Sequence, residues 1–217
     1  MPWFGPLGSL SWNASIWLTE WARLRKEPWW WDLRRALKQE FADLDPHQLV
    51  QRLRGKQHIG SLAFGETPCL SVLKILETAQ LEAGARLVDL GSGRGLPCLT
   101  ASARGFPSLG LEYFAVYTER STRIAKSLGL PATFLSGNLL SRPLPPAQLY
   151  LISATAFPES FRAQLQQHLH QAPSNCWIVT QDWILDPPFV VTRMQQLPVS
   201  WGVARFVYHQ KPPFSPP

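Results

Sequence analysis

The sequence predicts an α/β protein built on a doubly wound, mostly parallel sheet of seven strands that ends in an edge hairpin. Three observations support this prediction. From about residue 61, short apolar runs alternate with amphipathic helical runs, the pattern of strands that are covered on both faces. The last two strand-like runs follow each other without an intervening helical run. Seven of the ten tryptophans fall within residues 1–60, which predicts a small tryptophan-rich helical layer ahead of the sheet.

The expected strands are short and rich in leucine, isoleucine and valine. They cover 86–90, 108–113, 132–136, 148–153, 176–181, 189–196 and 203–209. Helices are expected between them over 97–103, 115–128 and 159–170. Another helix is expected ahead of the first strand, capped by Thr67, started by Pro68 and continuing to about residue 82. Threonine at a cap followed by proline favours the beginning of a helix.

Apolar stripes in the first sixty residues predict three short helices, over 14–27, from Pro28 to about residue 41, and over 46–55. The stripes are Trp17, Leu18, Trp21 and Leu24 in the first helix, and Trp30, Leu33, Leu37 and Phe41 in the second. Packing of both stripes onto the main domain is the favoured interpretation. Peripheral membrane contact or a partner-docking face is the alternative, because tryptophan suits both.

These patterns divide the chain into an N-terminal extension over 1–60, a main domain over 61–211 and a proline-rich tail over 212–217. The net charge is +6 and the pI is about 9.5, with the basic residues spread along the chain. Proteins that bind nucleic acid usually cluster their charge. A nucleic-acid partner is therefore not expected, an acidic partner stays open, and no pattern indicates an oligomeric state.

Three cysteines, Cys69, Cys98 and Cys176, lie far apart in apolar surroundings. Their spacing matches no metal site, and their odd number argues against a disulfide framework. Buried free thiols in a reducing compartment are expected, without a bound metal. No signal-peptide pattern is seen, and no run approaches the ~18 apolar residues of a spanning helix. The expected location is the cytoplasm.

The stretch 85-ARLVDLGSGRGLPCL-99 predicts a buried strand, a glycine-rich turn and the start of a helix. Its three glycines permit positive φ and the close approach of a ligand. Leu96 stands where a dinucleotide turn has its third glycine or alanine, and no Gly-Lys-Ser/Thr follows for a phosphate loop. Asp89 would repel a pyrophosphate, whereas it suits the cationic amino group of S-adenosylmethionine. The turn therefore predicts an S-adenosylmethionine site.

Two further polar residues complete the expected cofactor site. Glu112 ends the next strand, where a carboxylate can accept hydrogen bonds from both hydroxyls of a ribose. Asn138 follows the third strand and is placed to bond an adenine edge, although Gly-Asn is also a common turn.

The succession of strand, Asp-Leu-Gly-Ser-Gly-Arg-Gly turn, helix, strand and Glu112 resembles the class I S-adenosylmethionine-dependent methyltransferases over about residues 61–210. This resemblance implies a Rossmann-like sheet and an enzyme that transfers a methyl group from S-adenosylmethionine. It also implies that Asp89, Gly91 and Gly93 contact the methionine moiety of the cofactor, while Glu112 holds the ribose.

Within that class, 64-FGETP-68 and 154-ATAFPESFRAQL-165 are most similar to the disruptor-of-telomeric-silencing type of histone lysine methyltransferases and their bacterial relatives. The similarity implies that a Phe-Gly-Glu-Thr segment lies over the cofactor and that a phenylalanine closes the methyl-transfer end. The residues that would take these places are Phe64, Glu66, Thr67 and Phe157. Where that family typically has asparagines after the fourth strand, this chain has Ser153 and Ala154.

The expected acceptor is an amine, with protein lysine as the first candidate. Methyl transfer needs in-line positioning, exclusion of water and a neutral nucleophile, and an apolar channel favours the neutral amine. The expected aromatic walls of that channel are Phe64, Phe157, Trp183 and Tyr113. Asp182, after the fifth strand, is the expected catalytic carboxylate. The alternatives are a small-molecule methyltransferase and, from another class, a non-catalytic cofactor-binding or membrane-peripheral docking protein.

Overall fold

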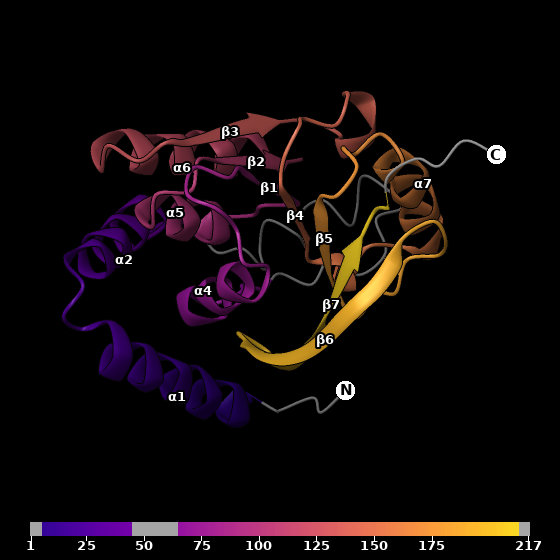
Figure 1. Ribbon diagram of the computed structural model, residues 1–217. Helices are drawn as coiled ribbons and strands as arrows, with labels where there is room; N and C mark the ends of the chain where they lie inside the picture. The colour runs from indigo at the N-terminus through magenta and orange to yellow at the C-terminus, as the bar shows by residue number, and fades with distance from the viewer. Residues whose placement is uncertain (1–5, 45–64, 213–217) are drawn as a thin grey trace.

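The computed structural model describes residues 6–44 and 65–212. Its seven-stranded sheet has the order β3-β2-β1-β4-β5-β7-β6 (Figure 1). The first five strands run parallel, and β7 runs antiparallel to both β5 and β6. The strands are β1 (Leu87–Leu90), β2 (Ser108–Glu112), β3 (Ala132–Ser136), β4 (Leu149–Ile152), β5 (Trp177–Gln181), β6 (Val190–Val199) and β7 (Gly202–Gln210). The predicted α/β fold and its edge hairpin are confirmed.

Helices cover both faces of the sheet, because successive side chains of the buried strands point to opposite sides. One face packs against α2, α4, α5 and α6, and the other packs against α7 (Figure 1). The helices are α1 (Pro6–Leu24), α2 (Pro28–Glu40), α4 (Cys69–Thr78), α5 (Leu96–Ala103), α6 (Ala115–Ser127) and α7 (Glu159–Leu169), with short 3-10 segments η1 (Leu139–Ser141) and η2 (Ala154–Ala156). The strand order reverses between β1 and β4, and ligands bind at such reversals in doubly wound folds.

The predicted stripe of the second helix is confirmed. Trp30 and Leu33 of α2 are fully buried, and Phe41, just beyond the helix, is 5% exposed. Ion pairs Arg120–Asp43 and Arg123–Glu40 also fasten the end of α2 to α6. Apolar contacts along one side of α2 and ion pairs at its C-terminal end thus hold the N-terminal layer against the rest of the protein.

The prediction for the stripe of the first helix is wrong for three of its four residues, and only Leu24 is buried against the body. Its outward-facing residues are Trp17 (39% exposed), Leu18 (56%) and Trp21 (37%). The body-facing side of α1 contains Glu20 and Leu24, which are 2% and 6% exposed. From the same side, Trp12 Nε1 donates a hydrogen bond of 2.7 Å to the carbonyl oxygen of Val199.

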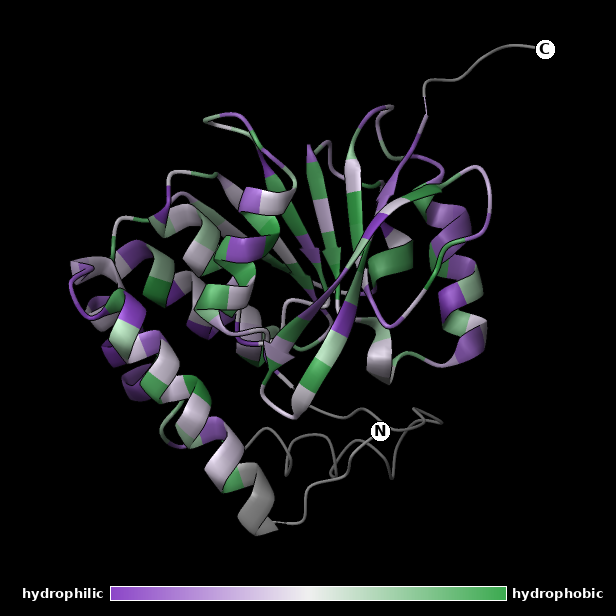
Figure 2. Ribbon diagram, turned by 60° about the horizontal axis from the view of Figure 1, so that its bottom comes forward, coloured by the Kyte–Doolittle hydropathy of each residue, from purple (hydrophilic) through white to green (hydrophobic). Residues whose placement is uncertain are grey.

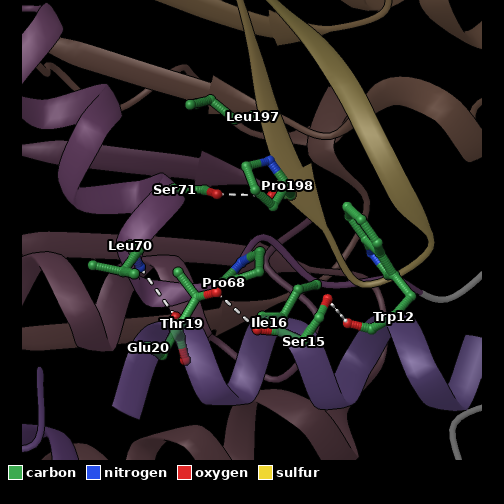
Figure 3. Close-up of a pocket in the computed structure, with 10 residues that line it drawn as sticks. All are labelled: Trp12, Ser15, Ile16, Thr19, Glu20, Pro68, Leu70, Ser71, Leu197 and Pro198. Atoms are coloured by element: carbon green, nitrogen blue, oxygen red, sulfur yellow. Dashed lines mark hydrogen bonds between the residues drawn. The ribbon is translucent and has the colours of Figure 1, made fainter. Parts of the chain in front are cut away.

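A buried carboxylate decides which side of α1 faces the body. Glu20 Oε1 accepts the N–H of Leu70 at 3.1 Å (Figure 3), and Oε2 lies 3.2 Å from Arg34 Nη1. The first N–H groups of a helix lack partners within the helix, so this carboxylate stabilises the N-terminus of α4. Around the contact, α1, the start of α4 and the end of β6 enclose a cavity of about 280 Å³. No residue of the glycine turn is among those that line it.

The predicted boundaries of α4 are corrected by the same contact. The helix begins at Cys69, with Pro68 as its N-cap and no side-chain cap of its own, and it ends at Thr78. Thr67 Oγ1 is buried and has no hydrogen-bond partner among the residues that the structure describes. The expected cap therefore comes from Glu20 on another helix rather than from Thr67.

Two other groups of sequence expectations can be placed. The three cysteines are buried free thiols, as predicted. The predicted helix over 46–55 and the candidate site residue Phe64 lie outside the described residues.

Candidate cofactor and active site

The glycine turn leaves β1 where the strand order reverses. Gly91 and Gly93 adopt φ values of +96° and +51°, which residues with a side chain rarely adopt. The N–H groups of Gly91 and Ser92 both donate to the carbonyl oxygen of Leu111, at 2.8 and 3.0 Å. The turn is therefore fixed to the end of β2, with backbone rather than side chains at its surface.

Two buried carboxylates lie beside this turn on one face of the sheet. Asp89 of β1 is in register with Gly110 of β2, and Glu112 falls on that face two residues later, because side chains alternate along a strand. Glu112 accepts the N–H groups of Gly93 at 2.8 Å and Phe114 at 3.0 Å, which orient its carboxylate. Asp89 is 2% exposed, and no group of the described residues donates a hydrogen bond to its carboxylate.

Burial makes the ionised form of both carboxyl groups unfavourable. Burial and the negative charge of Glu112 raise the pKa of Asp89 from 3.8 to about 8. Burial also raises the pKa of Glu112, although the N–H groups of Phe114 and Gly93 oppose that effect. An unpaired buried charge is costly, and an opposite charge beside it removes much of the cost. The pair therefore favours a ligand that brings a cation to Asp89 and hydroxyl donors to Glu112.

The residues present fit S-adenosylmethionine better than a dinucleotide. The amino group of that cofactor would pair with Asp89, its ribose hydroxyls would donate to Glu112, and the backbone at Gly91 and Gly93 permits close approach. A pyrophosphate offers neither a cation to Asp89 nor hydroxyl donors to Glu112, and any ionised carboxylate here would repel it. The expected placement of these four residues in one site is thus met by the geometry.

The segment before α4 is tied to the glycine turn by an ion pair that sequence reasoning missed. Arg94 of the turn donates from Nε to Glu66 Oε1 at 2.8 Å and from Nη2 to Glu66 Oε2. Two parallel bonds of this kind fix the relative orientation of the two side chains. The only signal in the sequence was the position of Arg94 inside the turn. Glu66 is therefore engaged by the protein, and its direct contact with a cofactor stays a prediction.

The tip of the edge hairpin clamps the same segment from the other side. The N–H of Glu66 donates to Ser200 Oγ at 2.8 Å, and the N–H of Ser200 donates to the carbonyl oxygen of Glu66 at 2.9 Å. A side chain at Gly65 would place its Cβ 1.8 Å from the ring of Trp201. The indole thus lies directly against the backbone that precedes Thr67. Close packing against Trp201 therefore explains the glycine of 64-FGETP-68, in addition to the functional role that the resemblance implies.

Aromatic side chains gather at the end of β4, where the acceptor is expected. A Cβ on Gly91 would lie 3.1 Å from the Phe157 ring, so this ring covers the glycine turn. The Phe157 and Phe161 rings are 5.0 Å apart at centroid, and Trp183 belongs to the same partly buried apolar group. Phe157 is therefore positioned over the first glycine, as expected for a residue that closes the site.

Gln181, the last residue of β5, is a second residue that sequence reasoning missed. Its side chain is fully buried, and neither the oxygen nor the nitrogen of its amide has a hydrogen-bond partner in the described part of the chain. Buried amides are nearly always hydrogen-bonded. Gln181 is thus available to bond a ligand at the carboxyl ends of β4 and β5, but no sequence pattern distinguishes it from the rest of an apolar strand.

Three other candidates have structural roles or lie apart. Asn138 is exposed, and its side-chain oxygen accepts the N–H of Leu140 at 3.0 Å to cap η1. Asp182 Oδ1 accepts the N–H of Arg205 at 3.1 Å, which joins the ends of β5 and β7. Tyr113 is 48% exposed. The adenine contact of Asn138 and the catalytic role of Asp182 remain predictions.

Comparison with known proteins shows which fold this is. No protein-family model matches the sequence, and no curated protein matches it. An RNA methyltransferase from Salinibacter ruber, solved with S-adenosyl-L-homocysteine, is 23% identical over 69% of this chain and 95% of its own, with a TM-score of 0.58.

Two further structures are more distant in sequence. TrmN from Thermus thermophilus is 16% identical over 66% of this chain and 48% of its own, with a TM-score of 0.55. Precorrin-6y C5,15-methyltransferase from Geobacter metallireducens is 13% identical over 65% of this chain and 88% of its own, with a TM-score of 0.53. The chain therefore has the Rossmann-like fold of the S-adenosylmethionine-dependent methyltransferases.

Proposed function

We propose that this protein is an enzyme that transfers a methyl group from S-adenosylmethionine to an acceptor. The observation that carries the proposal is the pair of buried carboxylates, Asp89 and Glu112, beside a glycine turn at the reversal of strand order. Asp89 has no hydrogen-bonding partner of its own among the described residues. A ligand with an ammonium group supplies the cation that Asp89 lacks, and the hydroxyls of its ribose can donate further hydrogen bonds to Glu112, which the N–H groups of Gly93 and Phe114 already orient.

The residues around that pair would have separate roles in binding the cofactor, positioning the segment before α4 and excluding water. S-adenosylmethionine, when bound, supplies an electrophilic methyl group on its sulfonium. Asp89 would bind its ammonium group and Glu112 its ribose hydroxyls, so that the position of the cofactor is set from two points. The Glu66–Arg94 ion pair holds the segment before α4 against the turn. Phe157 covers Gly91 and would exclude water from the methyl-transfer end, which prevents hydrolysis of a reactive group.

For the acceptor we propose an amine, with protein lysine as the first class to test. The support is the apolar surface made by Phe157, Phe161 and Trp183, since desolvation lowers the pKa of an amine toward the neutral, nucleophilic form. An RNA base or a small molecule is the second candidate. The buried, unpaired amide of Gln181 favours it, because a planar amide can bond donor and acceptor groups together.

Cofactor binding is tested by thermal unfolding with S-adenosylmethionine, S-adenosylhomocysteine or NAD. The first two should raise the unfolding temperature and NAD should not, because only a ligand that binds the folded state stabilises it. Asp89→Ala and Glu112→Ala should abolish the shift. Glu119→Ala is the matched control, since Glu119 is an exposed carboxylate of α6. Unchanged shifts in both site variants would refute the cofactor assignment.

The acceptor is tested with methyl-labelled S-adenosylmethionine and a fractionated lysate. Label in protein that survives nuclease and appears on lysine supports the first class. Label that nuclease releases, or that stays in the small-molecule fraction, replaces it with the second. Gln181→Leu should reduce transfer to a nucleobase acceptor while leaving the cofactor-induced thermal shift intact.

A further inference from the structure

We propose that the outer face of α1 binds the surface of an anionic lipid bilayer. This inference goes beyond the proposed enzymatic function and does not depend on it. The face is defined by exposed apolar side chains on α1 and at the start of α2, called here the tryptophan patch. Its members are Leu10 (69% exposed), Trp17 (39%), Leu18 (56%), Trp21 (37%) and Trp31 (41%).

The patch lies on one ridge of the molecule. Leu10, Trp17 and Trp21 are separated by seven and four residues, so they follow one side of a helix. That side borders the body-facing side of α1, where Leu24, seven residues after Trp17, is buried, whereas Leu10, Trp17 and Trp21 stay exposed. α1 runs along the outside of the fold, and none of the described helices or strands covers its outer face (Figures 1 and 2).

The start of α2 extends the ridge. Trp31 Nε1 donates to the carbonyl oxygen of Arg25 at 3.0 Å, which places its indole beside the C-terminal end of α1. The guanidinium of Arg25 lies 4.9 Å from the ring centroid of Trp21. Indole rings and a cation thus share one surface, the combination that suits the boundary between lipid headgroups and acyl chains.

The uncompensated charge around the patch is positive. Each carboxylate of residues 10–44 takes part in an ion pair: Glu20–Arg34, Glu27–Arg104, Asp32–Arg35, Glu40–Arg123 and Asp43–Arg120. Within that range, the cations without an ion pair are Arg23, Arg25, Lys26 and Lys38. A surface with exposed cations and no free carboxylate complements phosphate headgroups, and each cation near an anionic bilayer adds to binding.

The shape and chemistry of the ridge favour lipid over a groove-binding partner. A helix that stands out from the body presents large rings and long basic side chains to a flat surface, and contact of this kind is peripheral. Among the described helices, none is long and apolar enough to cross a membrane. On the body-facing side of α1, Trp12 and Glu20 join the helix to β6 and α4 by hydrogen bonds.

The test is co-sedimentation of the full-length protein with vesicles of phosphatidylcholine alone or mixed with phosphatidylglycerol. The patch variant is Trp17→Ser/Trp21→Ser, and the charge variant is Arg25→Gln/Lys26→Gln. The matched control is Met194→Ser/Val203→Ser, which alters two exposed apolar residues of β6 and β7 (46% and 53% exposed). Unfolding temperatures of all variants are compared first, so that loss of binding is not mistaken for loss of fold.

Wild-type protein should sediment with the anionic vesicles and far less with phosphatidylcholine alone, and added salt should weaken the binding. The patch variant should bind about tenfold less and the charge variant about threefold less, while the control binds like wild type. No sedimentation of wild type with anionic vesicles overturns the proposal, as does equal binding of the patch variant. A wild-type dimer that the patch variant turns into a monomer, without vesicle binding, would identify a self-association surface instead.

Discussion

Replacing Asp89 with asparagine is expected to reduce a pH dependence of stability that the wild-type protein has near neutral pH. Burial beside Glu112 raises the pKa of the Asp89 carboxyl from 3.8 to about 8 in the folded state. Between these two values the folded state holds a proton that the unfolded state has released. The free energy of unfolding of the wild-type protein therefore falls as the pH rises toward 8.

The magnitude follows from the size of the pKa difference. One pH unit corresponds to about 1.4 kcal/mol, so a difference of roughly 4 units is worth on the order of 5 kcal/mol. Between about pH 6.5 and 7.5 the expected loss is about 1.4 kcal/mol. In this window the lowered pKa of buried His209 has only a small opposite effect, because the imidazole of the unfolded state loses most of its remaining protons just above its ordinary pKa of 6.5.

The assay is urea unfolding of the wild-type protein, Asp89→Asn and the control Glu119→Gln at several pH values in this window. The asparagine variant should show a smaller pH dependence of its free energy of unfolding, and the part that remains comes from Glu112, whose pKa burial also raises. It should be more stable than wild type, since it removes an ionisable group from an apolar site. Saturating S-adenosylhomocysteine should flatten the wild-type slope, because its ammonium group would keep the carboxylate ionised. An equal slope in wild type and Asp89→Asn would refute the reasoning.

Three further predictions concern the contacts that hold the site together. Arg94→Met should weaken cofactor affinity about fivefold by calorimetry, because it releases the segment before α4, while Arg104→Met, which removes an exposed ion pair, should leave affinity unchanged. Gly65→Ala should lower the free energy of unfolding by about 1–3 kcal/mol, since its Cβ would overlap the Trp201 ring. Adding Trp201→Ala should restore part of the loss. A Gly65→Ala variant as stable as wild type would contradict the contact between the hairpin tip and this segment. Glu20→Gln should destabilise the protein by about 1–3 kcal/mol, because it breaks a buried ion pair, and an unchanged urea midpoint would show that the contact with α4 is unimportant.

The sheet could be predicted from the sequence because its signals are local. The central strands β1 and β4 are short apolar runs that are buried on both faces, and the absence of a helical run between the last two strands predicts their antiparallel pairing. The positions of the expected cofactor-binding residues could also be predicted from the sequence. Asp89 and Glu112 each stand at the end of a predicted strand, and parallel strands with adjacent ends bring such residues together.

The orientation of α1 could not be predicted, because it depends on contacts between distant parts of the chain. The sequence places apolar residues on two sides of this helix, with a charge at Glu20 on one of them. A charge normally marks the solvent side. Here its burial is compensated by the N–H of Leu70, fifty residues further on, and by Arg34. The same contact explains why the cap expected at Thr67 is absent.

The cofactor end of the site therefore depends on residues close together in the sequence, whereas the acceptor end depends on residues that are far apart in it. The cofactor end is built from one turn and two neighbouring strands, within residues 89–112, so its chemistry can be read along the chain. The proposed acceptor end would join Phe157, Gln181 and the segment before α4, and Ser200 and Trp201 hold that segment in place from the hairpin tip. Only the folded chain brings those parts together. Acceptor specificity is consequently best tested by measuring methyl transfer with variants of Phe157 and Gln181 that keep the cofactor-induced thermal shift. Such variants separate acceptor binding from cofactor binding.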